Sequence, residues 1–127
     1  MDDVVQESQE SQVLSVAPSE VAAAAVAAEA KGAHNIVVLD VAGVSGITSY
    51  FLICSAPSDR QVKAITGAVE QGVAEVDGTR PMAVEGADTF DWVLMNYGYF
   101  LVHVFQQESR EFYDLERLWR DAPRATW

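Results

Sequence analysis

The fold is decided by one stretch in the C-terminal half, Asp91-Trp92-Val93-Leu94-Met95-Asn96-Tyr97-Gly98-Tyr99-Phe100-Leu101-Val102-His103-Val104-Phe105. Two apolar runs flank a turn at Gly98, which predicts an antiparallel hairpin. Because side chains alternate faces along a strand, we expect Trp92, Leu94 and Asn96 to share one face of the sheet. The other elements are assigned outward from this hairpin.

Upstream of the hairpin, turn residues and apolar periodicity divide the chain into two helices and three strands. The expected ranges are a helix from Ser19 to about Lys31, antiparallel strands at 35–41 and 50–54, a helix from Asp59 to about Val76, and an edge strand at 81–85. Ser19 is the expected N-cap of the first helix. Ser58 and Gln61 have the spacing of a capping box, in which the hydroxyl accepts from a backbone N–H and the glutamine reaches back.

Downstream of the hairpin, residues 108–120 return to a helical period, which places Phe112 and Trp119 on one face. The resulting order of elements, α, β, β, α, β, β, β, α, predicts an α/β (mixed α+β) fold. It has a single mixed sheet of about five strands with flanking helices. We expect residues 19–122 to form one domain and residues 123–127 to form a loose C-terminal tail.

Charge is distributed unevenly along the 127 residues, which carry eight Lys or Arg and 19 Asp or Glu for a net charge of −11. Residues 1–20 hold five of these acids and no base, so residues 1–18 are predicted to form a disordered acidic leader. The longest mostly apolar stretch, 21–28, is too short to span a membrane. Neither a secretory signal nor a transit peptide is recognisable, and the single cysteine, Cys54, fits a reducing compartment, so we expect a cytoplasmic protein.

The excess of acidic over basic residues also limits the class of partner that the protein can bind. It argues against a protein held to nucleic acid by its overall charge, because neutralising phosphates needs clustered Lys and Arg. It permits a basic protein partner, including one that forms part of a nucleoprotein.

Residues that could carry chemistry are few. His103 shares a strand face with apolar neighbours and is interpreted as a core histidine, and nothing indicates that it converges with Cys54 as a nucleophile pair. One Cys and two separated His lack a zinc-ligand spacing, and no phosphate-binding glycine motif is present. Asp40 has no second acid beside it on its strand, as two-metal phosphoryl transfer would need. We therefore predict no enzyme, cofactor or metal, and interpret Glu116 and Arg120 as a weak (i, i+4) ion pair.

The region Glu85–Tyr99 combines acidic and aromatic side chains on a strand and turn. Trp and Tyr anchor many protein interfaces, but they also pack many cores. From the residues alone, an interface role and a core role for Trp92 and Tyr97 are about equally favoured.

Six segments of the chain together resemble a known family. They are Ile47–Ile53 (ITSYFLI), Asp59–Ile65 (DRQVKAI), Glu85-Gly86, Trp92–Gly98 (WVLMNYG), Val102–Phe105 (VHVF) and Arg110–Trp119 (REFYDLERLW). Their order and spacing resemble the ribosomal silencing factor family, also called RsfS or Iojap, across residues 23–122.

This resemblance implies a nucleotidyltransferase-like fold without catalytic residues, and a protein that represses translation. Family members bind the large ribosomal subunit through ribosomal protein L-fourteen and block its association with the small subunit, notably under nutrient limitation or in stationary phase. They often form homodimers off the ribosome, and their binding requires no direct recognition of nucleic acid and no membrane. Two alternatives stay open: a metal-dependent nucleotidyltransferase-like enzyme, and a dimeric cytoplasmic adaptor for another basic protein.

The resemblance also implies where the ribosomal protein binds. The expected contact residues are Trp92, Asn96, Tyr97 and Tyr99, with Glu85 and Asp91 as charge partners. Family members usually carry Asp at the positions of Asn96 and Tyr99, so this chain has less negative charge there than the family pattern.

Overall fold

A computed structural model describes residues 18–44 and 46–127 of the chain. The expected acidic leader therefore lies outside the described residues, except for Pro18. The elements are α2 (Ser19–Ala30), β1 (His34–Asp40), β2 (Tyr50–Ala56), α3 (Asp59–Asp77), β3 (Ala83–Glu85), β4 (Trp92–Asn96), β5 (Phe100–Gln106), α4 (Gln107–Tyr113), α5 (Leu115–Leu118) and β6 (Arg124–Thr126).

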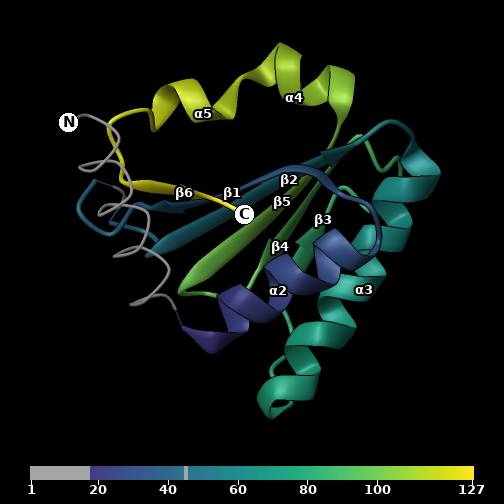
Figure 1. Cartoon of the computed structure of the whole chain (residues 1–127), viewed down its shortest axis with the longest axis horizontal. Coiled ribbons are helices and arrows are strands. Elements are labelled where there is room, and N and C mark those ends of the chain that lie inside the picture. The colour runs from purple at the N-terminus through teal and green to yellow at the C-terminus, as the bar shows by residue number, and fades with distance from the viewer. Residues whose placement is uncertain (1–17, 45) are drawn as a thin grey trace.

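One mixed sheet of six strands forms the centre of the structure, in the order β3-β4-β5-β2-β1-β6 (Figure 1). The predicted β4–β5 hairpin and the antiparallel β1–β2 pair are confirmed, and β3 is the predicted edge strand. Among the strands of the described residues, only β2 and β5 run parallel, and they are separated along the chain by α3 and the β3–β4 region. The expected mixed α+β fold is therefore confirmed.

The C-terminal residues form strand β6, so the prediction of a loose tail at 123–127 is wrong. β6 pairs antiparallel with β1, and the Asp40 N–H donates to the Pro123 carbonyl at 2.8 Å. Ala125 is fully buried within this pair. A three-residue strand has too little local stability to be recognised from its own sequence, and its backbone is ordered here by the otherwise unpaired edge of β1.

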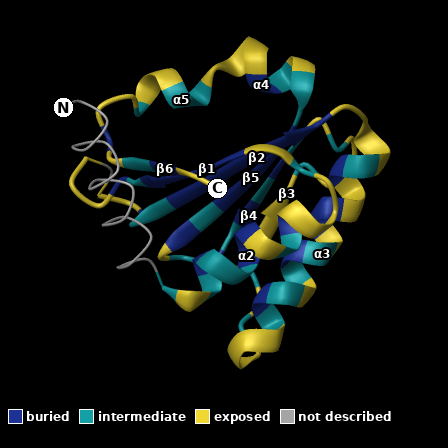
Figure 2. Cartoon of the chain, in the orientation of Figure 1, coloured by how far each residue is buried: buried dark blue, intermediate teal, exposed yellow. Residues whose placement is uncertain are grey.

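One face of the sheet is covered by α2 and α3, and this interface holds the larger core. Four residues of α3 recur at helical spacing and are all fully buried: Val62, Ile65, Val69 and Val73. The apolar period that predicts this helix consists of these four residues and Val76, which is instead 43% exposed near the end of the helix. The helix itself is confirmed. Figure 2 shows the buried strands enclosed between the helices, whose outward sides are exposed.

The start of α3 follows only part of the capping-box prediction. The Ser58 hydroxyl accepts from the Gln61 N–H at 3.2 Å, as expected. The Gln61 side chain does not return to Ser58, because its amide instead lies beside the Lys31 and Gly32 carbonyls at 3.3 and 3.4 Å. It thereby connects the end of α2 to the start of α3. The helix α2 begins at Ser19 itself, so Pro18 occupies the N-cap position predicted for Ser19.

The opposite face of the sheet is covered by α4 and α5, which are two short helices rather than the single helix predicted for 108–120. Asp114 breaks the helix with a left-handed backbone (φ 47°), a conformation that Asp adopts more readily than most residues. The break corrects the expected apolar face. Trp119 packs edge-on against Phe51 at 5.3 Å between ring centroids, whereas Phe112 is 81% exposed.

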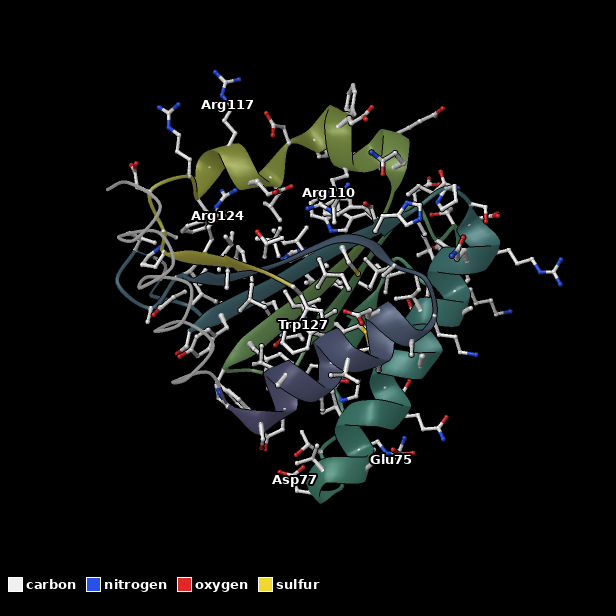
Figure 3. All side chains as sticks on the ribbon, viewed as in Figure 1. Glu75, Asp77, Arg110, Arg117, Arg124 and Trp127 are labelled. Carbon is white, nitrogen blue, oxygen red and sulfur yellow. The ribbon has the colours of Figure 1, made fainter. Side chains whose placement is uncertain are left out.

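Arg110 fastens α4 and α5 to the sheet. It is buried, and its guanidinium donates to the Asn35 carbonyl at 2.8 Å and to the Ser55 hydroxyl at 3.0 Å. Its Nε also forms an ion pair with Glu116 of α5 at 2.9 Å. Figure 3 shows Arg110 pointing from α4 toward the strands. The predicted Glu116–Arg120 pair is therefore wrong, because Glu116 is paired with Arg110.

We predict that Arg110→Met lowers the free energy of unfolding by about 2–3 kcal/mol, because it leaves the buried Ser55 hydroxyl and the Asn35 carbonyl without their donor. Urea unfolding monitored by circular dichroism measures this change. The matched control is Arg117→Met on the exposed side of α5, for which the expected change is within about 0.5 kcal/mol. Equal unfolding midpoints for the two variants would contradict this role for Arg110.

Candidate partner-binding surface

The sheet face beneath α4 is incompletely covered at strands β3 and β4. The register places Leu94 between Glu85 and His103, and Asn96 between Ala83 and Leu101. Along β4, buried residues alternate with half-buried ones, and the half-buried set is Trp92, Leu94 and Asn96. This alternation confirms that these three side chains share a face, and it leaves that face partly open to a partner.

Trp92 is held rigidly although it is partly exposed. Its ring stacks on Phe105 and packs against Tyr113 of α4, with ring centroids 4.9 Å apart in both pairs. Its indole N–H donates to Nδ1 of His103 at 3.1 Å. An aromatic residue fixed in this way loses little conformational entropy on binding, which suits an interface anchor.

His103 is the buried histidine that the sequence indicated. Because Nδ1 accepts from Trp92, the neutral ring carries its proton on Nε2, which has no hydrogen-bond partner among the described residues. Phe51 packs edge-on against the ring at 5.0 Å between centroids. Burial in these surroundings lowers the pKa of His103 to about 4, so the ring is neutral at physiological pH.

Cys54 and His103 lie on opposite faces of the sheet. The register sets Ile53 opposite His103 and Cys54 opposite Val104, so the thiol points into the α2–α3 core. Burial raises the pKa of the Cys54 thiol to about 12, which keeps it protonated. These two residues therefore do not form a nucleophile pair, in agreement with the sequence interpretation.

Tyr97 packs in the core rather than on the open face. It is 4% exposed, and its ring is nearly parallel to that of Phe100 at 4.5 Å between centroids. Burial raises the pKa of Tyr97 to about 12. Strand alternation accounts for this position, because Tyr97 follows Val93 and Met95 on the buried face. Its predicted direct contact with a partner is thus not supported by its placement.

Asn96 and Tyr99 shape the turn between β4 and β5. The Asn96 side-chain oxygen accepts from the Gly98 N–H at 2.8 Å, a bond that an Asp carboxylate can also accept. Tyr99 is 39% exposed at the far end of the turn. Its partial burial and the nearby Glu20 carboxylate raise the pKa of Tyr99 to about 12. Asn96 is thus half-buried beside the open face, whereas Tyr99 interacts with the start of α2.

Glu85 and Asp91 are both exposed at the two ends of the β3–β4 connection. Gly86 follows Glu85 with a left-handed backbone (φ 85°), and a Cβ there would lie only 2.0 Å from the Trp92 carbonyl oxygen. The glycine is therefore required for the chain to pass close to β4. This close passage positions an acidic side chain at the rim of the open face.

The helix α4 adds exposed aromatic residues, among them Phe112, which the sequence placed on one helix face with Trp119. Phe112 is 81% exposed and Tyr113 is 54% exposed, with their ring centroids 5.1 Å apart. Because Tyr113 also packs on Trp92, these rings extend the open strand face without interruption. We call this combined area the β4–α4 surface, and it comprises Glu85, Trp92, Leu94, Asn96, Phe112 and Tyr113.

The comparisons with known proteins identify the family of the chain. A sequence profile described as "Ribosomal silencing factor during starvation" matches residues 15–126. The chain belongs to the ribosomal silencing factor family. A protein of Bacillus subtilis named "Ribosomal silencing factor RsfS" is 43% identical over 102 residues, which cover 80% of this chain and 86% of that protein.

Two crystal structures support the same family fold. One, of a protein from Chromobacterium violaceum, has a TM-score of 0.75 and 30% identity, covering 80% of this chain and 84% of that chain. The other, from Bacillus halodurans, has a TM-score of 0.68 and 35% identity, covering 83% of this chain and 92% of that chain. The family names indicate a ribosome-related role in regulating translation.

Two features of other protein classes are absent from the described residues. Across residues 18–44 and 46–127, no group of three or more His, Cys, Asp or Glu side chains is placed to hold a metal ion. No helix within these same ranges is long and apolar enough to cross a membrane.

We predict that acidification destabilises the fold through His103. Its pKa is about 4 when folded and lies near the ordinary 6.5 when unfolded, so between these values the unfolded chain binds more protons. The free energy of unfolding attributable to this residue therefore falls by about 2 kcal/mol from pH 7 to pH 5.

The His103 contribution is measured by urea unfolding of the wild type and of His103→Asn at both pH values. The wild type should lose more stability on acidification than the variant. Histidine NMR provides a check that does not depend on the variant folding. A His103 ring signal that titrates near pH 6.5 in the wild type would refute the prediction.

Proposed function

We propose that this protein represses translation by binding the large ribosomal subunit through ribosomal protein L-fourteen. Bound there, it sterically blocks association with the small subunit, notably under nutrient limitation or in stationary phase. The observation that carries the proposal is the β4–α4 surface, on which exposed and half-exposed aromatic rings adjoin exposed acids. This combination suits a basic protein partner, since aromatic anchors supply binding energy and rim charges guide encounter.

The residues of this surface have distinct proposed roles. Trp92 and Phe112 are the apolar anchors, and Asn96 supplies a polar contact beside them. Glu85 and Asp91, both exposed, face basic side chains of the partner. Tyr97 supports the turn from the core, and Tyr99 lies at the outer limit of the contact.

The proposed mechanism is competition rather than catalysis. A factor that binds the free large subunit, but not the joined ribosome, shifts the equilibrium toward separated subunits by mass action. The required property is therefore affinity for the joining face of the large subunit. No cofactor is needed for this step, and no direct recognition of nucleic acid is required for specificity.

Off the ribosome, a second copy of the chain occupies the same surface. Apolar area of this kind is costly to leave in water, and self-association of two copies would bury it. Such a homodimer in the cytoplasm would compete with ribosome binding, because both use the β4–α4 surface.

The first test of the proposed surface is Phe112→Ala. We expect it to weaken binding to purified large subunits, and to isolated L-fourteen, by about tenfold or more, as for a truncated interface anchor. Its stability should be unchanged because the ring is 81% exposed. The matched control is Val26→Ala on α2, which truncates another exposed apolar residue on the opposite side of the sheet. Equal affinities of the two variants for L-fourteen would remove Phe112 from the interface.

The second test reverses a charge at the rim. Glu85→Lys should slow association with isolated L-fourteen, because a basic residue would then approach a basic partner. The reduction should diminish as salt is raised, since exposed charges are screened. The control is Glu29→Lys, an exposed acid on α2 with the same change in net charge. An equal reduction in both variants would mean that only the total charge matters, which contradicts an acidic contact at Glu85.

A further inference from the structure

Three of the chain's eight basic residues occur close together near its C-terminus. Residues 117–124 contain Arg117, Arg120 and Arg124 but only one acid, Asp121. We call these three arginines the arginine edge. This concentration contrasts with a chain whose overall net charge is −11.

No arginine of the edge forms an ion pair with another residue that the structure describes. The two ion pairs found among the described residues are Arg110–Glu116 and Arg80–Glu70, and neither includes an arginine of the edge. Arg117 and Arg120 are exposed, and Figure 3 shows Arg117 pointing away from the ribbon. The guanidinium groups of Arg117 and Arg120 are thus available to an external partner, whereas Arg124 is half-buried on β6.

The edge adjoins the β4–α4 surface. Helix α5 follows α4 directly, with only Asp114 between them. Leu118, between the first two arginines of the edge, is 75% exposed, and the half-buried Trp119 beside it packs on Phe51. A partner that covers α4 therefore continues onto α5, whose Glu116 is already paired with Arg110 and whose Arg117 is exposed.

The sign of this charge limits the class of partner. A basic ribosomal protein would be repelled by the arginine edge, whereas it is attracted to Glu85 and Asp91 at the other end of the surface. RNA phosphates are the complementary group, because the planar guanidinium donates two parallel hydrogen bonds to phosphate oxygens. On the large subunit, such phosphates belong to ribosomal RNA.

We propose that Arg117, Arg120 and Arg124 bind the phosphate backbone of ribosomal RNA beside the protein contact. This inference rests on the proposed function, since it requires the chain to dock on the large subunit. The contact is independent of RNA sequence and adds affinity and orientation. It predicts that binding to the intact subunit depends more strongly on salt than binding to the isolated ribosomal protein does.

The test compares Arg117→Gln/Arg120→Gln with a control double variant, Arg60→Gln/Lys63→Gln. Both remove two exposed bases and change the net charge from −11 to −13 (−11 − 2), but the control bases lie on α3. Dissociation constants are measured for purified large subunits and for isolated L-fourteen at several salt concentrations.

The proposal predicts that only the arginine-edge variant loses affinity for the large subunit. Removing two phosphate contacts lowers the salt slope, which is the steepness with which log affinity falls against log salt concentration, by about 1 for each contact. Between 50 and 200 mM salt, the affinity of the variant for large subunits therefore falls roughly tenfold less than that of the wild type. Its affinity for isolated L-fourteen should be unchanged.

Two results would overturn the proposal. The first is an unchanged salt slope for large subunits in the arginine-edge variant, which means that these side chains meet no phosphate. The second is an equal loss of affinity for isolated L-fourteen, which assigns the arginines to the protein contact. Failure of the wild type to bind large subunits at all is a different result, because it rejects the proposed function itself.

Discussion

The side of the structure formed by α4 and α5 depends on the buried guanidinium of Arg110. Its bonds to the Asn35 carbonyl and the Ser55 hydroxyl hold α4 against β1 and β2, and its ion pair with Glu116 holds α5 in line. Without this connection, the two short helices joined at Asp114 would be held only by apolar contacts such as Trp119 on Phe51 and Tyr113 on Trp92, because short helices have marginal stability of their own. The positions of the exposed rings on α4 and of the arginine edge on α5 both follow from it.

Three kinds of side chain follow one another across this surface, from the β3–β4 end to the α5–β6 end. Acidic side chains lie at the β3–β4 end, aromatic rings occupy the middle, and arginines lie at the α5–β6 end. Trp92 is central because it contacts Phe105 below, Tyr113 beside it and His103 through a hydrogen bond. The Trp92 ring is therefore held in place by both the sheet and α4. A surface with opposite charges at its two ends suits a composite target of basic protein and RNA, which a ribosomal subunit presents.

The elements predicted correctly from sequence are those with strong local patterns. The β4–β5 hairpin has two apolar runs around Gly98, and α3 has both the Ser58 cap and a regular apolar face. The errors occur where distant contacts decide the structure. Strand β6 forms only because β1 offers an unpaired edge, and the break at Asp114 depends on Arg110 fixing both helices.

The candidate site was predicted in part for the same reasons. Alternation along β4 places Trp92 and Asn96 on the open face, but the same rule assigns Tyr97 to the core, as the structure confirms. Phe112 could not be assigned to the surface from its period, because the helical pattern of 108–120 assumes an unbroken helix. The exposure of the α4 rings therefore follows from the break at Asp114, which the helical pattern does not show.

Under the proposed function, this protein prevents the ribosomal subunits from joining by occupying the large subunit. Light scattering of purified subunits mixed with increasing amounts of the protein tests it most directly. The expected result is that the apparent association constant of the subunits falls by a factor of 1 plus the ratio of the protein concentration to its dissociation constant. Unchanged joining when every large subunit carries the protein would contradict it.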